Sequence, residues 1–353
     1  MRVARLHDAA AYALLFLVVG EIALPAALRH RLPRAEEEGR NPHARRNWDE
    51  YVSKTSVRRP GERVVLLVSN SQGRGPEVPA SQSYPQLLEA RLDRERPGEP
   101  VRVVNWSFGP NRVPETILLL ARSPDLDPDV VLVVQPPNWF REEDYTYHSR
   151  PTPLAMFPSD IVDTAWLYRD RLPPDFVSHY IRPVQAVDAL LARGLRSYRY
   201  RDWPVSFLRH HLPWLEAFVP ERDRAAWFLE GRQGLRPLRE RPRLDPALVG
   251  SPWPQPTLLR LFTEAALPLR ARKVFVFQPH PFLVRSPEAA FPALREHLLT
   301  HGWEVWDMMG AVPWSLFLEG NVHFGPRGHV VFAESLARRV EPLLDREDSS
   351  SSR

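Results

Sequence analysis

The chain has 353 residues, of which 43% are hydrophobic and 25% charged, a composition typical of a globular protein rather than a disordered or fibrous one. Its 47 basic and 43 acidic residues leave a net charge of +4 with no basic cluster, which argues against a nucleic-acid partner. Because the chain contains no cysteine, disulfides, thiolate zinc sites and cysteine catalysis are excluded.

An apolar segment lies near the start of the chain. Residues 9–28 are almost entirely apolar, follow Arg2 and Arg5, and match the ~20 residues that a helix needs to span a bilayer. We therefore expect residues 1–33 to form an N-terminal membrane helix that acts as a signal anchor, or else a cleaved signal peptide. Pro25 interrupts the one stretch that could hold a cleavage site, which favours the anchor. A buried or amphipathic first helix is the third interpretation.

Two polar segments flank the expected domain. Residues 34–62 have almost no apolar periodicity and are interpreted as a spacer between membrane and domain. Residues 346–353, with their run of serines, are interpreted as a disordered tail.

Five short apolar runs, rich in β-branched residues, predict the strands of the domain. They are residues 64–68, 101–105, 130–134, 274–277 and 304–306. Continuous rather than alternating apolar character is typical of strands buried on both faces, as in a parallel sheet covered by helices. Helical patterns at 83–94, 115–122 and 289–301 separate the runs.

This order predicts a three-layer α/β/α sandwich with a five-stranded, mainly parallel sheet, built from residues 64–140 and 256–345. Residues 141–255 differ, because they are rich in aromatic residues and proline and their best pattern is helical, with Val184, Val187 and Leu191 at helical spacing. We interpret them as a helical insertion packed over one end of the sheet.

The residues that follow each strand predict the site, because ligands of open parallel sheets bind at the carboxyl ends of the strands. Ser71 follows the first strand, Gly109 the second, Asn138 the third, and His323 lies in the loop after the fifth. Acyl transfer needs a nucleophile, a base within reach and donors for the developing oxyanion. We expect Ser71 to be the nucleophile and His323 the base, with the Ser71 and Gly109 amides and the Asn138 side chain as the oxyanion hole.

In these residues the sequence resembles the SGNH, or GDSL-like, hydrolases, which are named for a serine, a glycine, an asparagine and a histidine in four blocks. The similar segments are Ser69-Asn70-Ser71, Asn105 to Gly109, Pro136-Pro137-Asn138, and Gly320-Asn321-Val322-His323 followed by Gly328-His329. The resemblance covers about residues 64–140 and 256–342 and leaves the insertion unexplained. It implies a serine esterase or acyltransferase that works through an acyl-enzyme on Ser71.

The sequence departs from the family pattern where the family has an aspartate three residues before its histidine, because that position is Gly320. The aspartate would orient the imidazole and stabilise its charged form. Two residues could replace it: Glu319, which precedes Gly320 and is favoured by proximity, and Asp307 at the end of the fifth strand. A backbone carbonyl, or no partner at all, is the third possibility.

The resemblance implies a substrate class and a location. We expect acyl or acetyl esters of envelope carbohydrate or lipid as substrates, no cofactor and no metal, with the domain held outside the cytoplasmic membrane of a bacterium by residues 9–28. The sequence does not distinguish hydrolysis from transfer of the acyl group to another hydroxyl, since both reactions proceed through the same acyl-enzyme. The alternative is a catalytically inactive protein of the same fold that binds a glycan or a protein partner, which the missing aspartate favours.

Overall fold

The computed structural model describes residues 52–53, 55–75, 77–107, 111–136, 139–140, 164–180, 190–191, 237, 255–281, 290–318 and 322–345. The expected membrane helix at 9–28 and the expected tail at 346–353 lie outside these residues, so the N-terminal helix has no support from the structure. Within the described ranges, no helix is both long enough and apolar enough to cross a membrane.

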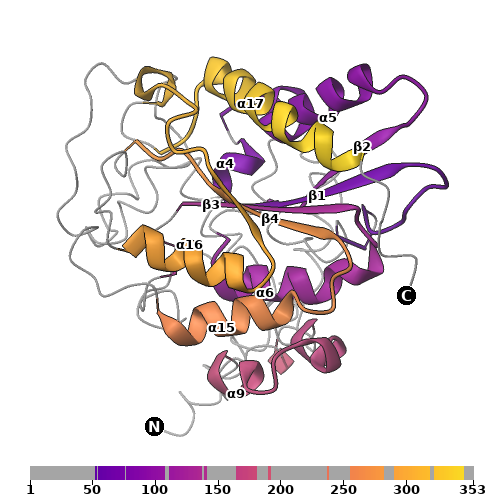
Figure 1. Cartoon of the computed structure of the whole chain (residues 1–353), viewed down its shortest axis with the longest axis vertical. Coiled ribbons are helices and arrows are strands. Elements are labelled where there is room, and N and C mark those ends of the chain that lie inside the picture. Colours follow the sequence, from indigo (N-terminus) through magenta and orange to yellow (C-terminus); the bar gives the residue numbers. More distant parts are fainter. Residues whose placement is uncertain are drawn as a thin grey trace, which may run out of the picture.

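The centre of the fold is a five-stranded sheet in which every neighbouring pair is parallel. The strands are β1 (Arg63–Ser69), β2 (Val101–Asn105), β3 (Val130–Gln135), β4 (Arg272–Phe277) and β5 (Glu304–Asp307). Their order is β2-β1-β3-β4-β5 (Figure 1). This confirms the predicted α/β fold and the predicted strands to within two residues at each end. It also shows that the segments before and after the expected insertion contribute strands to one sheet.

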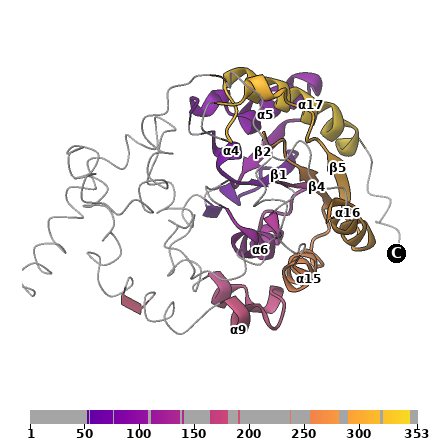
Figure 2. The same cartoon turned by 90° about the vertical axis from the view of Figure 1, so that its left-hand side faces the viewer.

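Helices cover both faces of the sheet, as the continuous apolar runs predict. They are α5 (Tyr84–Glu95), α6 (Val113–Arg122), α15 (Pro256–Ala265), α16 (Ala290–Thr300) and α17 (Pro326–Leu344). Figures 1 and 2 show α5 and α17 on one face, and α6, α15 and α16 on the other. Every residue of β3 is buried, because this central strand has a neighbour on each side and helices above and below.

Alternate residues of each strand supply two separate cores. Leu66 and Val133 point to the core under α6 and α15, whereas Leu67 and Leu132 point to the core under α5 and α17. The first core is rich in aromatic rings, with Phe262 stacked on a tryptophan at a ring distance of 4.9 Å. Burying apolar area on both faces supplies the main driving force for this arrangement.

The strand order reverses beside β1, since the chain passes from β1 to β2 on one side and later to β3 on the other. The chain segments that follow β1 and β3 therefore lead to helices on opposite faces of the sheet (Figure 1). Ligands of doubly wound sheets bind at such a switch point. Ser71 lies directly after β1, so the fold places the expected nucleophile there.

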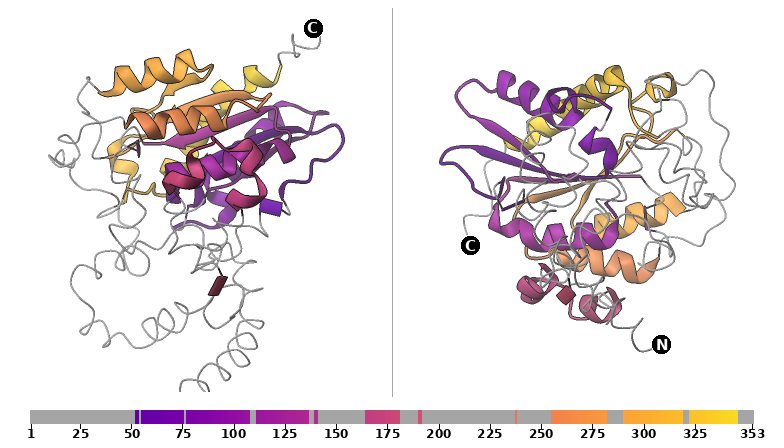
Figure 3. Two further views of the ribbon diagram at one scale, coloured as in Figure 1. Left: turned by 90° about the horizontal axis from the view of Figure 1, so that it is seen from below. Right: turned by 180° about the vertical axis from the view of Figure 1, so that it is seen from behind.

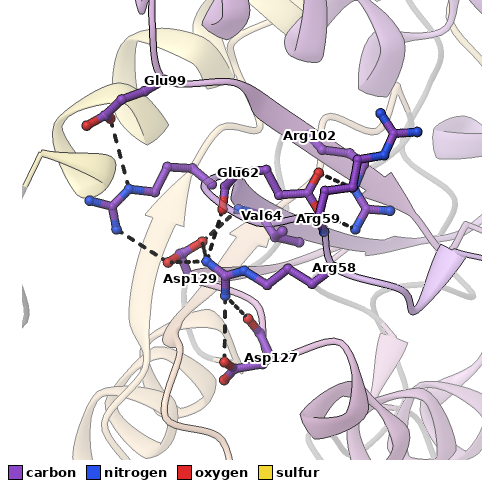
Figure 4. Close-up of polar contacts among 9 residues, drawn as sticks. Arg58, Arg59, Glu62, Val64, Glu99, Arg102, Asp127 and Asp129 are labelled. Carbon is purple, nitrogen blue, oxygen red and sulfur yellow. Dashed lines mark hydrogen bonds and ion pairs between the residues drawn. The ribbon is translucent and has the colours of Figure 1, made fainter.

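A polar network at the opposite, amino-terminal edge of the sheet corrects the expected spacer at 34–62 (Figure 4). The Asp129 carboxylate accepts hydrogen bonds from the Val64 amide at 2.7 Å and from Arg58 at 2.9 Å. Val52 is fully buried in the core, and Thr55 Oγ1 accepts a bond of 2.9 Å from the indole of a buried tryptophan. The described end of this segment, 52–53 and 55–62, therefore belongs to the packed domain.

The longest described part of the expected insertion, 164–180, packs on the outside of the α6–α15 layer (Figure 3). It includes α9 (Phe176–Tyr180), and Phe176 is buried in the core beneath it. An ion pair joins Asp175 to Arg260 on α15. The predicted packing of the insertion over one end of the sheet concerns mostly residues outside the described ranges. Nearly all of 181–254, including the helical pattern at 184–191 except its last two residues, lies outside the described residues.

Candidate active site

The expected nucleophile begins a four-residue helix, α4 (Ser71–Arg74), immediately after β1. Asn70 caps this helix, because its side-chain Oδ1 accepts a hydrogen bond from the Gln72 amide at 2.9 Å. Its Nδ2 donates to Gln135 Oε1 at 3.1 Å, which ties the turn to the end of β3. Asn70 thus fixes the geometry of the turn that carries Ser71.

Two glycines shape the chain after Ser71. A Cβ on Gly73 would lie 2.3 Å from Ser107 Oγ and 2.7 Å from Ser69 Cβ, so only glycine lets α4 pack this closely on the ends of β1 and β2. Gly75 ends the helix in the left-handed region, at φ 62°, and its amide donates to the Ser71 carbonyl. The turn at Gly75 sends the chain back toward the site, and Glu77 follows two residues later.

The expected base lies in a loop packed between β5 and α17. The Leu318 amide donates to the His323 carbonyl at 3.0 Å. Phe317 and Phe324, the residues next to this pair, form an antiparallel β-bridge with each other. The rings of Phe317 and Phe324 lie 5.0 Å apart and are both buried. These contacts hold the histidine loop against the sheet, and the His323 side chain is only 10% exposed.

Ser71 and His323 meet although they are 252 residues apart. His323 Nε2 lies 2.7 Å from Ser71 Oγ, and His323 Nδ1 lies against the Oε1 atom of Glu77. Because an ionised carboxylate only accepts hydrogen bonds, its place beside Nδ1 assigns the imidazole proton to that nitrogen. Nε2 is then the acceptor, and the Ser71 hydroxyl donates to it. The serine hydroxyl, the imidazole and the carboxylate are therefore in hydrogen-bond contact, in the arrangement that acyl transfer would require.

Sequence reasoning missed Glu77, which is the carboxylate that the structure brings to His323. Asp307 is exposed at the end of β5, where its Oδ1 accepts a bond from the Met309 amide at 3.0 Å, so it is not brought to His323. Glu319 lies outside the described residues, whereas the Nδ1 atom it was expected to contact is bonded to Glu77. The glutamate thus comes from the nucleophile segment, not from the histidine loop.

The expected oxyanion hole is described only in part. Gly109 and Asn138 lie outside the described residues. The Ser71 amide is the first of α4 and thus one of those that a helix leaves without an intrahelical acceptor. No acceptor for it is found among the described residues, so this amide is available beside Ser71 Oγ.

A second buried histidine packs behind the site. His329 is fully buried at the start of α17, and its Nδ1 accepts a hydrogen bond from the Tyr84 amide at 3.2 Å. Burial lowers the pKa of His329 to about 3, with a smaller contribution from the positive charge that His323 can carry. His329 is therefore neutral at physiological pH and supports α5 without adding charge to the site. The Tyr84 hydroxyl in turn donates to Ser69 Oγ at 3.0 Å.

The described residues contain no group of three histidine, aspartate or glutamate side chains placed to hold a metal ion. The chain matches no protein-family model and no curated protein.

Proposed function

We propose that the protein is a serine esterase or O-acyltransferase that forms an acyl-enzyme on Ser71. One observation carries the proposal: Ser71 Oγ is 2.7 Å from His323 Nε2, while the Glu77 carboxylate bonds Nδ1 of the same ring. The position of Ser71 at the switch point of a doubly wound sheet supports it independently.

In the proposed reaction, Ser71 Oγ attacks the carbonyl carbon of an ester and its proton passes to His323 Nε2. The Glu77 carboxylate stabilises the imidazolium that results, and the Ser71 amide donates to the oxyanion of the tetrahedral intermediate. His323 then gives the proton to the leaving alcohol oxygen as the C–O bond breaks. Water, or the hydroxyl of an acceptor, attacks the acyl-enzyme in turn, and His323 acts again as the base.

The substrate class rests on the resemblance to SGNH hydrolases rather than on a contact in the structure. We propose an acyl or acetyl ester carried by envelope carbohydrate or lipid, with Gly109 and Asn138 completing the oxyanion hole. The apolar segment 9–28 supports a location outside the cytoplasmic membrane. A reporter that is active only in the periplasm, fused after Arg353, should be active, and activity of a reporter restricted to the cytoplasm would contradict this location.

Hydrolysis of p-nitrophenyl acetate by the purified chain tests the proposed chemistry. Wild type should turn over the ester, and Ser71→Ala and His323→Gln should each lose turnover to near the background rate. Ser335→Ala is the matched control, because Ser335 lies on α17 and its Oγ donates to the Val331 carbonyl within that helix. Unchanged turnover in Ser71→Ala would refute the assignment of the nucleophile.

The alternative of an inactive binding protein rested on the missing aspartate. Glu77 now occupies the place beside His323 that the aspartate was expected to fill. No observation in the described part of the chain favours the inactive alternative over the enzyme.

A further inference from the structure

The residue after the expected nucleophile links three parts of the site. Gln72 lies on α4 and is only 1% exposed, so its long polar side chain points inward. Its Nε2 donates to the Val322 carbonyl and, at 3.4 Å, to the Pro279 carbonyl. Val322 directly precedes His323, and Pro279 lies just after β4. One amide thus joins the helix that carries Ser71 to the histidine loop and to the carboxyl end of β4.

The hydrogen-bond pattern fixes the orientation of this amide. A side-chain NH2 group has two hydrogens to donate, and both acceptors here are carbonyl oxygens, which cannot donate. Rotating the amide by 180° would place its oxygen against two other oxygens, so the nitrogen must face Val322 and Pro279. The hydrogen bonds therefore require a donor at this position, and an apolar side chain of the same length would leave both carbonyls without it.

The need for such a link follows from how the site is assembled. Ser71 and Glu77 belong to one short segment and are held near each other by the turn at Gly75. His323 comes from a loop 252 residues away and must meet both of them at once. A displacement of about 1 Å at a reacting centre can cost about a hundredfold in rate. A direct bond from the nucleophile helix to the carbonyl before His323 limits that displacement.

We propose that Gln72 is a positioning residue, which holds the histidine loop against α4 so that His323 Nε2 stays within hydrogen-bond distance of Ser71 Oγ. This inference rests on the Ser71–His323 pairing of the proposed function. Gln72 does not touch the reacting atoms itself. Its removal should therefore lower kcat about tenfold or more and leave KM within about twofold, because only the arrangement of base and nucleophile changes.

The absence of cysteine from the chain offers a test that needs no substrate. Ser71→Cys introduces a single thiol, which is half-buried at the position of the hydroxyl. A histidine within reach stabilises a thiolate and lowers the thiol pKa below its ordinary ~8.5. The rate of alkylation by iodoacetamide as a function of pH reports that pKa, and hence how well His323 is placed.

Three thiol variants separate the two claims. The thiol pKa should be low in Ser71→Cys and return to about 8.5 in Ser71→Cys/His323→Gln. In Ser71→Cys/Gln72→Met it should lie at least about one unit above the value of Ser71→Cys, so that alkylation at a pH below the pKa slows about tenfold. If the first two do not differ, the proposed pairing of Ser71 with His323 is wrong. If they differ but Gln72→Met leaves the low pKa unchanged, the pairing stands and the role of Gln72 is refuted.

Controls distinguish positioning from stability. Thr263→Val, combined with Ser71→Cys, removes a buried hydroxyl that donates to the Leu259 carbonyl on α15, far from the site. This control should leave the thiol pKa at the value of Ser71→Cys alone, even if it lowers the melting temperature. Gln72→Asn keeps the polar amide but shortens the side chain. It replaces Gln72→Met in the thiol measurement if Gln72→Met does not fold. If either folded Gln72 variant, made in the Ser71→Cys background, keeps the low thiol pKa of Ser71→Cys alone, the proposal is overturned.

Discussion

Replacing Glu77 with glutamine tests the acid that the sequence did not reveal. The Glu77 and His323 side chains are 13% and 10% exposed, so water screens the charge between them only weakly. In the proposed reaction the imidazole becomes a cation when Ser71 gives up its proton, and Glu77→Gln removes the carboxylate beside this cation. We expect kcat to fall by about 10²–10⁴ while the protein stays folded.

The range follows from two contributions. A hydrogen bond to a charged group stabilises by about 1.5–3 kcal/mol, which at ~1.36 kcal/mol per tenfold corresponds to about 10- to 150-fold in rate. In addition, a glutamine can turn its NH2 toward Nδ1 and so move the imidazole proton to Nε2, where it blocks the base. The combined effect of an acid-to-amide change in a serine protease is about 10⁴.

The assay is the acylation rate with p-nitrophenyl acetate at about pH 8, with thermal melts to confirm folding. Asp307→Asn and Glu319→Gln are matched controls, since both remove a carboxylate and keep its shape. Each should change the rate by no more than about twofold if Glu77 is the acid that orients His323. Full activity in Glu77→Gln, or an equal loss in Asp307→Asn, would refute the role of Glu77.

Three further predictions concern stability, pH and the oxyanion hole. Gly73→Ala should destabilise by about 1–3 kcal/mol in urea unfolding and lower activity, because its Cβ would collide with Ser107 and Ser69, whereas Gly310→Ala, with no atom within 4 Å of its Cβ, should be nearly neutral. An equal effect of the two would contradict the close packing at α4. The low pKa of His329, about 3 against ~6.5 in the unfolded chain, means that the unfolded state binds a proton first as the pH falls. The free energy of unfolding should therefore be constant above about pH 6.5 and fall by up to ~1.4 kcal/mol per pH unit below it. This fall should be smaller in folded His329→Gln. If the free energy of unfolding falls equally steeply with pH in both proteins, His329 is not responsible. Asn138→Ala should lower kcat by about 10²–10³ with little change in the thermal midpoint, and an effect confined to KM would mean that Asn138 only binds substrate.

The strands could be predicted closely because each one contains a continuous apolar run, and these runs are buried on both faces of the sheet. Spacing predicted α5, α6 and α16, but it gave no range for α15 or α17. The α6 helix begins at Val113, two residues before the predicted pattern. Pro114 occupies its first turn, where a missing N–H costs no intrahelical bond. The pairing of Ser71 with His323 was also predictable, since both follow strands whose carboxyl ends share one edge.

Glu77 could not be predicted from the resemblance, because the family places its acid in the histidine loop. A local signal existed in Gly75-Pro76, a typical turn sequence, which predicts that the chain reverses soon after Ser71. Whether the next acidic side chain then points to the site depends on the left-handed conformation of Gly75, which the sequence permits but does not specify. The bonds of Gln72 to Val322 and Pro279 escape prediction for the same reason, since they join residues more than 200 positions apart.

Labelling with a serine-directed fluorophosphonate, followed by mass spectrometry of the peptides, tests the central claim most directly. The probe reacts only with a serine activated by a base and requires no knowledge of the natural ester. We predict one adduct, on Ser71, that is absent from Ser71→Ala and from folded His323→Gln. An adduct on another serine, or a wild-type protein that remains unlabelled under conditions where a known serine esterase reacts, would contradict the account.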